Sequence, residues 1–350
     1  MTALATGSAL AAGNAVAVEN LGKRYGRFTA VRDVSFGVPS GQVTALLGPN
    51  GAGKTTIVEI LTGLQVPSAG RAAVLGVPLR PGGRAPGREW RARIGVVLQS
   101  ASADPQLTVA EALSVFARLY PRPLAVADVL DVIGLAGDAG TRIGALSGGQ
   151  RRRADLGLGL IGRPELLFLD EPTTGLDPQA RRQLWDAIRS LTAGHCTVLL
   201  TTHSLPEAEE LASRLIVLDR GRVVADATPA QLRAGGPGPR IRLPLPDGAP
   251  VADLPPRLAP AAGTGHGELL ISSTDVAGDL AVLLSWARQH RVDVSALEVG
   301  PPGLEDAYLA LTGSGPAQRA PGPAVAECQS HPGAVAYGRT PAGTGGRGHE

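Results

Sequence analysis

The chain has 350 residues and a formal net charge of +2 at pH 7, and its basic residues are scattered rather than gathered in the stripe that nucleic-acid binding requires. Its two cysteines, Cys196 and Cys328, form neither a disulfide framework nor a metal-ligand spacing, and no stretch reaches about 18 uninterrupted apolar residues. We therefore expect neither a disulfide scaffold nor a membrane-spanning helix, but a soluble chain of a reducing compartment with one large and one smaller domain.

The first part of the chain predicts β structure followed by a strand, a loop and a helix. Residues 1–15, rich in alanine, are predicted to be disordered. Short strands at residues 16–20 and 31–36 indicate an antiparallel β layer. A nearly continuous apolar run at 43–47 ends at a glycine, as a buried parallel strand does, and residues 54–64 then predict a helix.

The remainder of the large domain alternates apolar strands with helices. Further buried strands are predicted at 94–98, 166–170, 197–201 and 215–218, and helices at 109–119, 149–161 and 179–191. This alternation predicts an α/β domain over residues 16–234. After a Gly/Pro linker at 235–239, a pattern of strand, strand, helix, strand and helix predicts a small α+β domain at 240–313. Residues 314–350, dominated by Gly, Pro and Ala, are predicted to be a disordered tail.

A complete P-loop pattern lies between the strand at 43–47 and the following helix. The glycines let backbone N–H groups turn toward phosphate oxygens, the helix N-terminus adds its dipole, and Lys54 brings a positive charge. Thr55 can present its hydroxyl to Mg²⁺. An incidental glycine-rich turn is the alternative, but the strand and helix around the loop argue against it. The predicted nucleotide-binding residues of this segment are Gly48, Pro49, Asn50, Gly51, Ala52, Gly53, Lys54, Thr55 and Thr56.

Two adjacent carboxylates end the apolar strand at 166–170. Asp170 is placed to hold the metal shell, and the next residue, Glu171, is placed to polarise water. Taken alone, such a pair is as often a solvated turn or a helix cap. The P-loop upstream favours ATP hydrolysis.

Residues 146–151, Leu-Ser-Gly-Gly-Gln-Arg, resemble the signature sequence of ABC ATPases. Ser147, Gly148 and Gly149 open a helix near Gln150, so that a hydroxyl, amides and a helix dipole form a second anion site. Alone, this stretch would be an ordinary serine cap. The resemblance implies that these four residues cap the ATP of a partner subunit. It also implies the ABC type of P-loop NTPase fold: a parallel core sheet, an antiparallel β layer and a helical signature subdomain.

Four further residues match the family only by their order and neighbours. Tyr25 resembles the aromatic residue that stacks on adenine, Gln99 the Q-loop glutamine, and His203 the switch histidine. Asp177 resembles the D-loop aspartate, which implies communication across a dimer. The resemblance implies three catalytic residues, namely Glu171, His203 and Gln99. It implies three metal ligands, namely Thr55, Gln99 and Asp170.

The end of the small domain resembles one subgroup of the family. Residues 303–313 are similar to the closing helix of daunorubicin-type and related ABC-2 exporter ATPases. This implies ATP and Mg²⁺ as cofactors, a homodimer, a separate polytopic membrane subunit, a place at the cytoplasmic face of the cell membrane, and export of a drug-like or lipophilic substrate. No nucleic acid is expected as a partner.

Two alternative functions remain open at this point. A soluble ABC ATPase acting on ribosomes or nucleic acid usually carries paired nucleotide domains or long coiled-coil insertions, whereas this chain has one set of motifs. A non-hydrolysing regulatory module would be expected to lose Glu171 or His203. Among the charged residues, Arg151 to Arg153 are expected to be solvent-exposed or at subunit contacts, and Glu59 to be exposed or to have a partner.

Overall fold

The computed structural model describes residues 13–84, 86–99, 103–194, 196–235, 238–246, 249–258, 262–265, 267–300 and 303–312. The predicted disordered N-terminus as far as residue 12, residues 236–237 of the predicted linker and the whole predicted tail lie outside the described residues. Within the described residues, no helix combines the length and the apolar composition that crossing a membrane requires.

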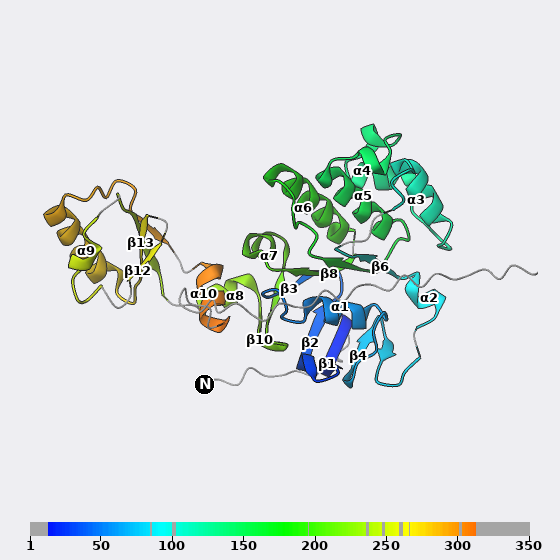
Figure 1. The fold of residues 1–350 in the computed structure, drawn as a ribbon, viewed down its shortest axis with the longest axis horizontal. Coiled ribbons are helices and arrows are strands. Elements are labelled where there is room, and N and C mark those ends of the chain that lie inside the picture. Colours follow the sequence, from blue (N-terminus) through cyan, green and yellow to red (C-terminus); the bar gives the residue numbers. More distant parts are fainter. Residues whose placement is uncertain are drawn as a thin grey trace, which may run out of the picture. The chain divides into compact units, whose positions relative to one another are not determined.

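The centre of the large domain is a six-stranded sheet in the order β10-β9-β3-β8-β7-β6 (Figure 1). Its strands are β3 (Val43–Leu47), β6 (Ile94–Val97), β7 (Leu166–Asp170), β8 (Thr197–Thr202), β9 (Arg214–Asp219) and β10 (Arg222–Ala227). The first five of these run parallel, and β10 pairs antiparallel with β9. This arrangement confirms the predicted α/β fold, and it brings the carboxyl ends of the parallel strands to one edge of the sheet.

One face of this sheet packs on an antiparallel layer in the order β2-β1-β4-β5. The layer consists of β1 (Asn14–Tyr25), β2 (Phe28–Pro39), β4 (Ala69–Val74) and β5 (Val77–Leu79). The helix α1 (Lys54–Leu61) shares its apolar core with both sheets, as Ile57, Leu46 and Phe168 illustrate. β1 begins at Asn14, earlier than the predicted start at Val16, and Ala15 is already buried.

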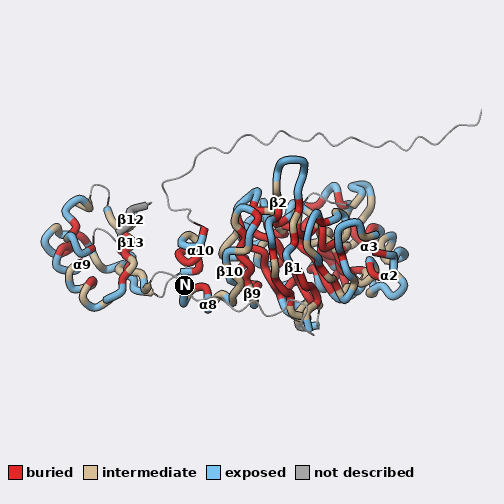
Figure 2. The backbone as a smooth tube through the Cα atoms, turned by 90° about the horizontal axis from the view of Figure 1, so that it is seen from below, coloured by how far each residue is buried: buried red, intermediate tan, exposed pale blue. Residues whose placement is uncertain are grey.

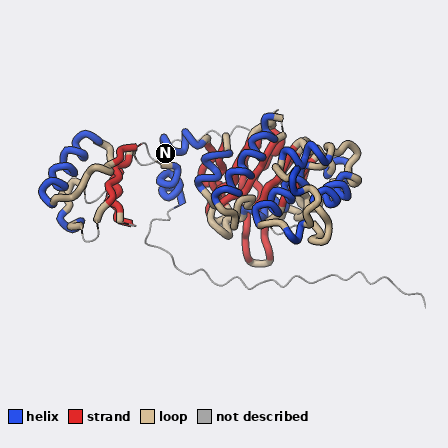
Figure 3. The backbone as a smooth tube through the Cα atoms, turned by 90° about the horizontal axis from the view of Figure 1, so that it is seen from above, coloured by secondary structure: helices blue, strands red, loops and turns tan. Residues whose placement is uncertain are grey.

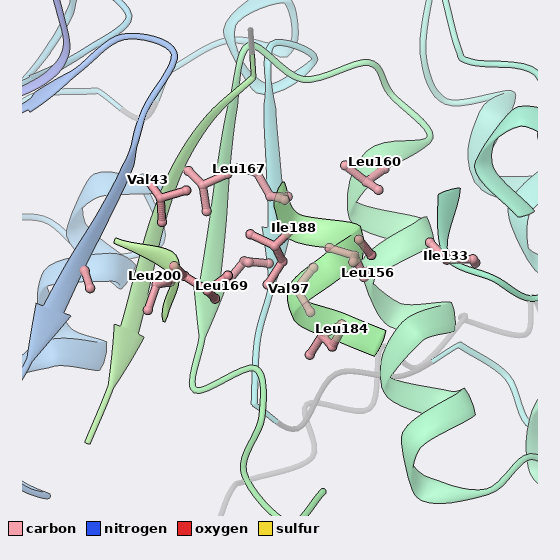
Figure 4. Close-up of a cluster of buried hydrophobic side chains, with 14 of the residues drawn as sticks. Val43, Val97, Ile133, Leu156, Leu160, Leu167, Leu169, Leu184, Ile188 and Leu200 are labelled. Atoms are coloured by element: carbon pink, nitrogen blue, oxygen red, sulfur yellow. The ribbon is translucent and has the colours of Figure 1, made fainter. Parts of the chain in front are cut away.

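Helices cover the other face of the parallel sheet (Figures 1 and 3). They are α3 (Val109–Ala117), α4 (Val126–Val132), α5 (Gly148–Leu160), α6 (Pro178–Ala193) and α7 (Leu205–Leu211), and the short α2 (Arg88–Arg91) precedes β6. Figure 4 shows Leu156 of α5 and Ile188 of α6 among the side chains of Leu167, Leu169 and Leu200. Because side chains alternate along a strand, Leu167 and Leu169 face these helices while Phe168 faces α1.

The C-terminal part has a core of its own. Its strands β11 (Arg240–Pro244), β12 (Ala262–Gly265), β13 (Glu268–Ser272) and β14 (Glu298–Gly300) form an antiparallel sheet in the order β12-β13-β11-β14. Buried residues such as Ile241 and Ile271 pack on Trp286 of α9 (Val276–His290). The sheet thus contains one strand more than the sequence pattern predicted.

Two helices flank this sheet in the sequence, namely α8 (Pro229–Ala234) and α10 (Leu304–Thr312). The last helix of the predicted small domain, α10, contributes Leu304 to the core of the large domain, and Tyr308 packs against that core. In Figure 2 the buried segments of the large domain are concentrated along its strands.

Candidate functional site

The predicted site residues gather where the parallel strands end. The P-loop follows β3, Asp170 ends β7, and Thr201 and His203 lie at the end of β8. Gln99 lies just beyond β6, which pairs with β7 through Val97 and Leu169. In open α/β sheets, ligands bind in the crevice outside the carboxyl ends of the strands.

The P-loop needs glycine at positions where a side chain has no space. Gly53 caps α1 in a left-handed conformation with φ of 99°, and a Cβ added there would lie 2.7 Å from the carbonyl oxygen of Ala30. A Cβ on Gly48 would lie 2.4 Å from the carbonyl oxygen of Leu218. No side chain caps the first turn of α1, so its backbone N–H groups stay available to an anion.

Lys54 occupies the centre of this loop and is only 4% exposed. Its Nζ donates to the carbonyl oxygens of Gly48, at 2.8 Å, and Pro49, at 3.1 Å. The same nitrogen lies 3.3 Å from Oε1 of Glu171. A buried ammonium is therefore held between the P-loop and the carboxylate that the sequence predicts to be catalytic.

Asp170 is buried and is held by two hydroxyls. Thr55 Oγ1 lies 3.2 Å from one carboxylate oxygen of Asp170 and 3.4 Å from the other. Thr201 Oγ1 donates to Asp170 Oδ1 at 2.5 Å and accepts from the backbone N–H of Glu171 at 3.0 Å. Thr201 was not among the predicted site residues, because only the parallel pairing of β7 with β8 brings it to Asp170.

Glu171 bridges the P-loop and the switch histidine. Its Oε2 lies 3.3 Å from His203 Nδ1 and accepts a hydrogen bond from Thr174 Oγ1 at 3.3 Å. Burial raises the pKa of Glu171, but the charge of Lys54 and the contact with His203 outweigh burial and leave the pKa below its ordinary value. An ionised carboxylate held in this way can accept a proton from water. Its φ of 45° is a left-handed conformation that a side chain adopts only at a cost.

The signature segment forms a second, separate site. Ser147 caps α5 through a capping box: its Oγ accepts from Gln150 N at 3.2 Å, and its own N–H donates to Gln150 Oε1 at 2.9 Å. A cavity of about 320 Å³ lies here, lined by Ser147, Gly149 and Asp177 among others, and no P-loop residue lines it in the described part of the chain. Asp177 caps α6, accepting from Ala180 N at 2.8 Å.

Two further predicted site residues, Tyr25 and Gln99, are exposed. Tyr25 ends β1 with 42% of its surface exposed, and Lys23 Nζ lies 5.0 Å from its ring centroid. Gln99 is exposed beyond β6. Both are accessible to a ligand, and their predicted roles stay predictions.

Of the expectations for charged residues, the one for Arg152 was wrong. Arg152 was expected to be exposed, but it is buried, with 9% of its surface accessible, because α5 presents this side chain to the sheet. The interpretation that the three arginines point in different directions holds, since Arg153 instead donates to the carbonyl oxygen of Gly134. Glu59 is partly buried, and burial and the charge of Asp170 raise its pKa, whereas Lys23 opposes that shift.

Glu207 of α7 is a second buried acid that the sequence analysis missed. It is 1% exposed and is surrounded by Thr202, Thr173 and Trp185, with the charges of Arg181 and Arg152 nearby. Burial raises the pKa of Glu207, and the polar neighbours only partly oppose that shift.

The raised pKa predicts a pH-dependent contribution of Glu207 to stability. Because the folded chain holds this proton more tightly than the unfolded chain, the free energy of unfolding falls as pH rises from the ordinary glutamate value through the folded value. Glu207→Gln should remove this loss and stabilise the chain at pH 8 by about 1 kcal/mol, with a smaller difference at pH 5. Thermal unfolding of the parent chain and of Glu207→Gln between pH 5 and pH 8 measures this difference in stability. Equal differences at both pH values would contradict the prediction.

A complete P-loop, a strand that ends in two carboxylates and a switch histidine in contact with one of them define a P-loop ATPase. The ABC transporter family model matches residues 31–174, and the model of the ABC transporter domain-containing protein-like, C-terminal domain matches residues 239–303. The daunorubicin resistance ATP-binding protein DrrA2 of Streptomyces coeruleorubidus is 42% identical over 316 residues, covering 86% of this chain and 96% of that protein. The Nod factor export ATP-binding protein I of Ralstonia nicotianae is 40% identical over 308 residues, covering 85% and 94%. The chain therefore belongs to the ATP-binding proteins of ABC transporters and is an ATPase, as its motifs predicted.

Solved structures agree with this assignment. An ATP-binding subunit of an ABC transporter matches with a TM-score of 0.55 at 27% identity, covering 63% of this chain and 92% of that chain. The ATP-binding cassette MJ0796 in a dimeric post-hydrolysis state matches with a TM-score of 0.54 at 24% identity, covering 61% of this chain and 98% of that chain. The second likeness shows the fold alone.

Proposed function

We propose that this chain binds and hydrolyses ATP to power an ABC-2 type exporter, which moves a drug-like or lipophilic substrate through a separate membrane subunit. It acts as a homodimer at the cytoplasmic face of the cell membrane. The observation that carries the catalytic part is the contact of Glu171 with both Lys54 and His203, next to Asp170. The relatives named for daunorubicin resistance and Nod factor export support an exporter of this subgroup. No observation favours action on ribosomes.

The residues around Asp170 suit a magnesium ion. Thr55 and Asp170 converge a hydroxyl and a carboxylate, and these are oxygen ligands of the kind Mg²⁺ prefers. We propose that Gln99, which follows the adjacent strand β6, adds an amide oxygen. Bound with ATP, the ion would neutralise charge on the β and γ phosphates.

The chain's own side chains divide the work of hydrolysis between binding and chemistry. Lys54 and the N–H groups at the start of α1 hold the phosphates of ATP, and Tyr25 stacks on the adenine. Glu171 orients a water molecule in line with the γ-phosphate and accepts its proton. His203 and Gln99 contact the γ-phosphate and complete the charge network.

A second copy of the chain completes each ATP site. The signature cavity and the P-loop are separate in one chain, although both are built to hold an anion: a helix N-terminus with a serine hydroxyl, and a glycine loop with a lysine. If two copies meet head to tail, Ser147 to Gln150 of one copy can cap ATP held at Gly48 to Thr56 of the other. Asp177, which lines the signature cavity, would lie at that contact.

An apolar groove suits the membrane partner. Its volume is about 530 Å³, and it lies between the end of α1, β6, α3 and α5, lined by residues that include Leu64, Val96, Phe116 and Leu158. Leu64 is 61% exposed and lies beside the other apolar side chains of this groove, and contiguous exposed apolar surface of this kind marks an interaction site. We place a short coupling helix of the membrane subunit in this groove.

Affinity isolation from detergent-solubilised membranes of the native host tests this function. The tagged chain with Glu171→Gln and ATP should co-purify a polytopic membrane protein. Leu64→Asp should lower its recovery about tenfold or more, because a charge would be buried in the apolar contact. Leu284→Asp, at a leucine of α9 that is 44% exposed, is the matched control and should leave recovery unchanged. Recovery only with ribosomes or nucleic acid would overturn the proposal.

A further inference from the structure

Arg152 holds together the backbone of the catalytic strand ends. Its Nε donates to the carbonyl oxygen of Pro172 at 2.9 Å, Nη1 to that of Leu98 at 2.8 Å, and Nη2 to that of Asp170 at 2.8 Å. A longer contact of 3.4 Å joins Nη2 to the carbonyl oxygen of Glu171. One guanidinium thus satisfies backbone acceptors from two segments at the ends of β6 and β7.

The segments that Arg152 joins have different tasks. It lies on α5 within two turns of Ser147, which caps that helix in the signature site. Leu98 directly precedes Gln99, and the carbonyls of Asp170 and Glu171 belong to the predicted metal ligand and the predicted general base. The side chain of Arg152 therefore connects the signature helix directly to the strand ends that carry the residues predicted to act on ATP.

The packing of α5 makes this connection stiff. The helix lies beside β6 (Figure 1), where a Cβ on Gly95 would come within 2.2 Å of the carbonyl oxygen of Gly159, and a Cβ on Gly159 within 2.7 Å of Val97 Cγ2. Glycines at this contact bring the helix close enough for the arginine to reach the strand ends. This close packing leaves no free space between α5 and β6 at the two glycines, so a displaced α5 would have to move β6 with it.

We propose that Arg152 is a positioning residue that couples the two ATP sites of the dimer. The proposal rests on the proposed function, because in a head-to-tail dimer α5 of one chain caps the ATP of the other chain, while Gln99 and Glu171 of the first chain act on its own ATP. A shift of the signature helix at one site then moves the Leu98 and Glu171 peptide groups at the second site.

Mixed dimers of the full-length chain test this coupling. One copy carries Glu171→Gln, so only one of the two ATP sites hydrolyses ATP. That active site consists of the P-loop of the unchanged copy and the signature helix of the copy with Glu171→Gln. Arg152→Lys is placed in one copy or the other, because lysine keeps the charge but lacks the planar guanidinium whose separate nitrogens donate to the carbonyls of both segments. The rate of the first phosphate release is measured in each arrangement, and Arg152→Gln repeats both. ATP binding by the isolated variants should match the parent, since the hydrogen bonds of Arg152 within the described residues go to Leu98, Asp170, Glu171 and Pro172 and not to the P-loop.

Coupling predicts that both arrangements slow phosphate release, each by roughly tenfold, and that the change in both copies together slows release by much less than the product of the two effects. Two effects that simply multiply would be independent local roles and would overturn coupling. If release slows only when the copy that supplies the P-loop of the active site is changed, Arg152 positions only the residues of its own site. If release slows only when the copy that supplies the signature helix is changed, Arg152 only supports that helix. Either result overturns coupling. Arg93→Lys is the matched control: Arg93 joins Glu165 at the amino end of β7 and should leave both rates unchanged. If the two copies do not associate in the presence of ATP, the proposed dimer is overturned. This outcome can be distinguished from a failure of coupling, in which the dimer forms but Arg152→Lys does not slow release in both arrangements.

Discussion

Glu171→Gln should lower ATP turnover roughly a thousandfold while leaving ATP bound at least as tightly as in the parent chain. The amide keeps the shape of the side chain but cannot accept the proton of the attacking water. The phosphate contacts lie elsewhere, in Lys54 and the N–H groups of α1, so binding should persist. Losing the negative charge also releases Lys54 from its ion pair, at 3.3 Å in this structure, toward the phosphates.

Steady-state phosphate release and equilibrium binding of ATP separate these two effects. Glu165→Gln is the matched control, since Glu165 lies at the other end of β7, is exposed and pairs with Arg93. It should hydrolyse ATP at the parent rate. If Glu171→Gln does so as well, Glu171 is not the general base.

The sequence predicts the parts of the site that one continuous segment contains. The P-loop combines spacing, a preceding strand and a following helix, and Gly53 has a local backbone reason, its left-handed conformation with φ of 99°. The capping box of Ser147 and Gln150 is likewise local. Such patterns are readable because the contacts involved join residues close in the sequence.

Contacts between segments that are distant in the sequence could not be predicted from local patterns. Thr201 reaches Asp170 only because β8 pairs with β7, and Glu207 is buried only because α7 packs against the segment around Thr173. Arg152 had only a weak signal: consecutive residues on a helix point in different directions, so one of three consecutive arginines can point toward the sheet that the helix covers. Which one does so depends on the rotation of α5, and that is set by packing at Gly157 and Gly159.

Gly149→Ala should lower ATP turnover about a hundredfold without weakening ATP binding to the P-loop. A Cβ at Gly149 would lie 2.5 Å from Cβ of Ala180, so the start of α5 must move away from α6 and misplace Ser147. Ala180→Gly removes that Cβ and leaves only a contact of 3.8 Å to the Cα, so the double variant should recover turnover to within several-fold of the parent. Ala180→Gly alone should cost about 1 kcal/mol of stability and little activity. Failure of the second change to restore turnover would mean that Gly149 serves the nucleotide directly, through space that the γ-phosphate needs, rather than through the approach of two helices.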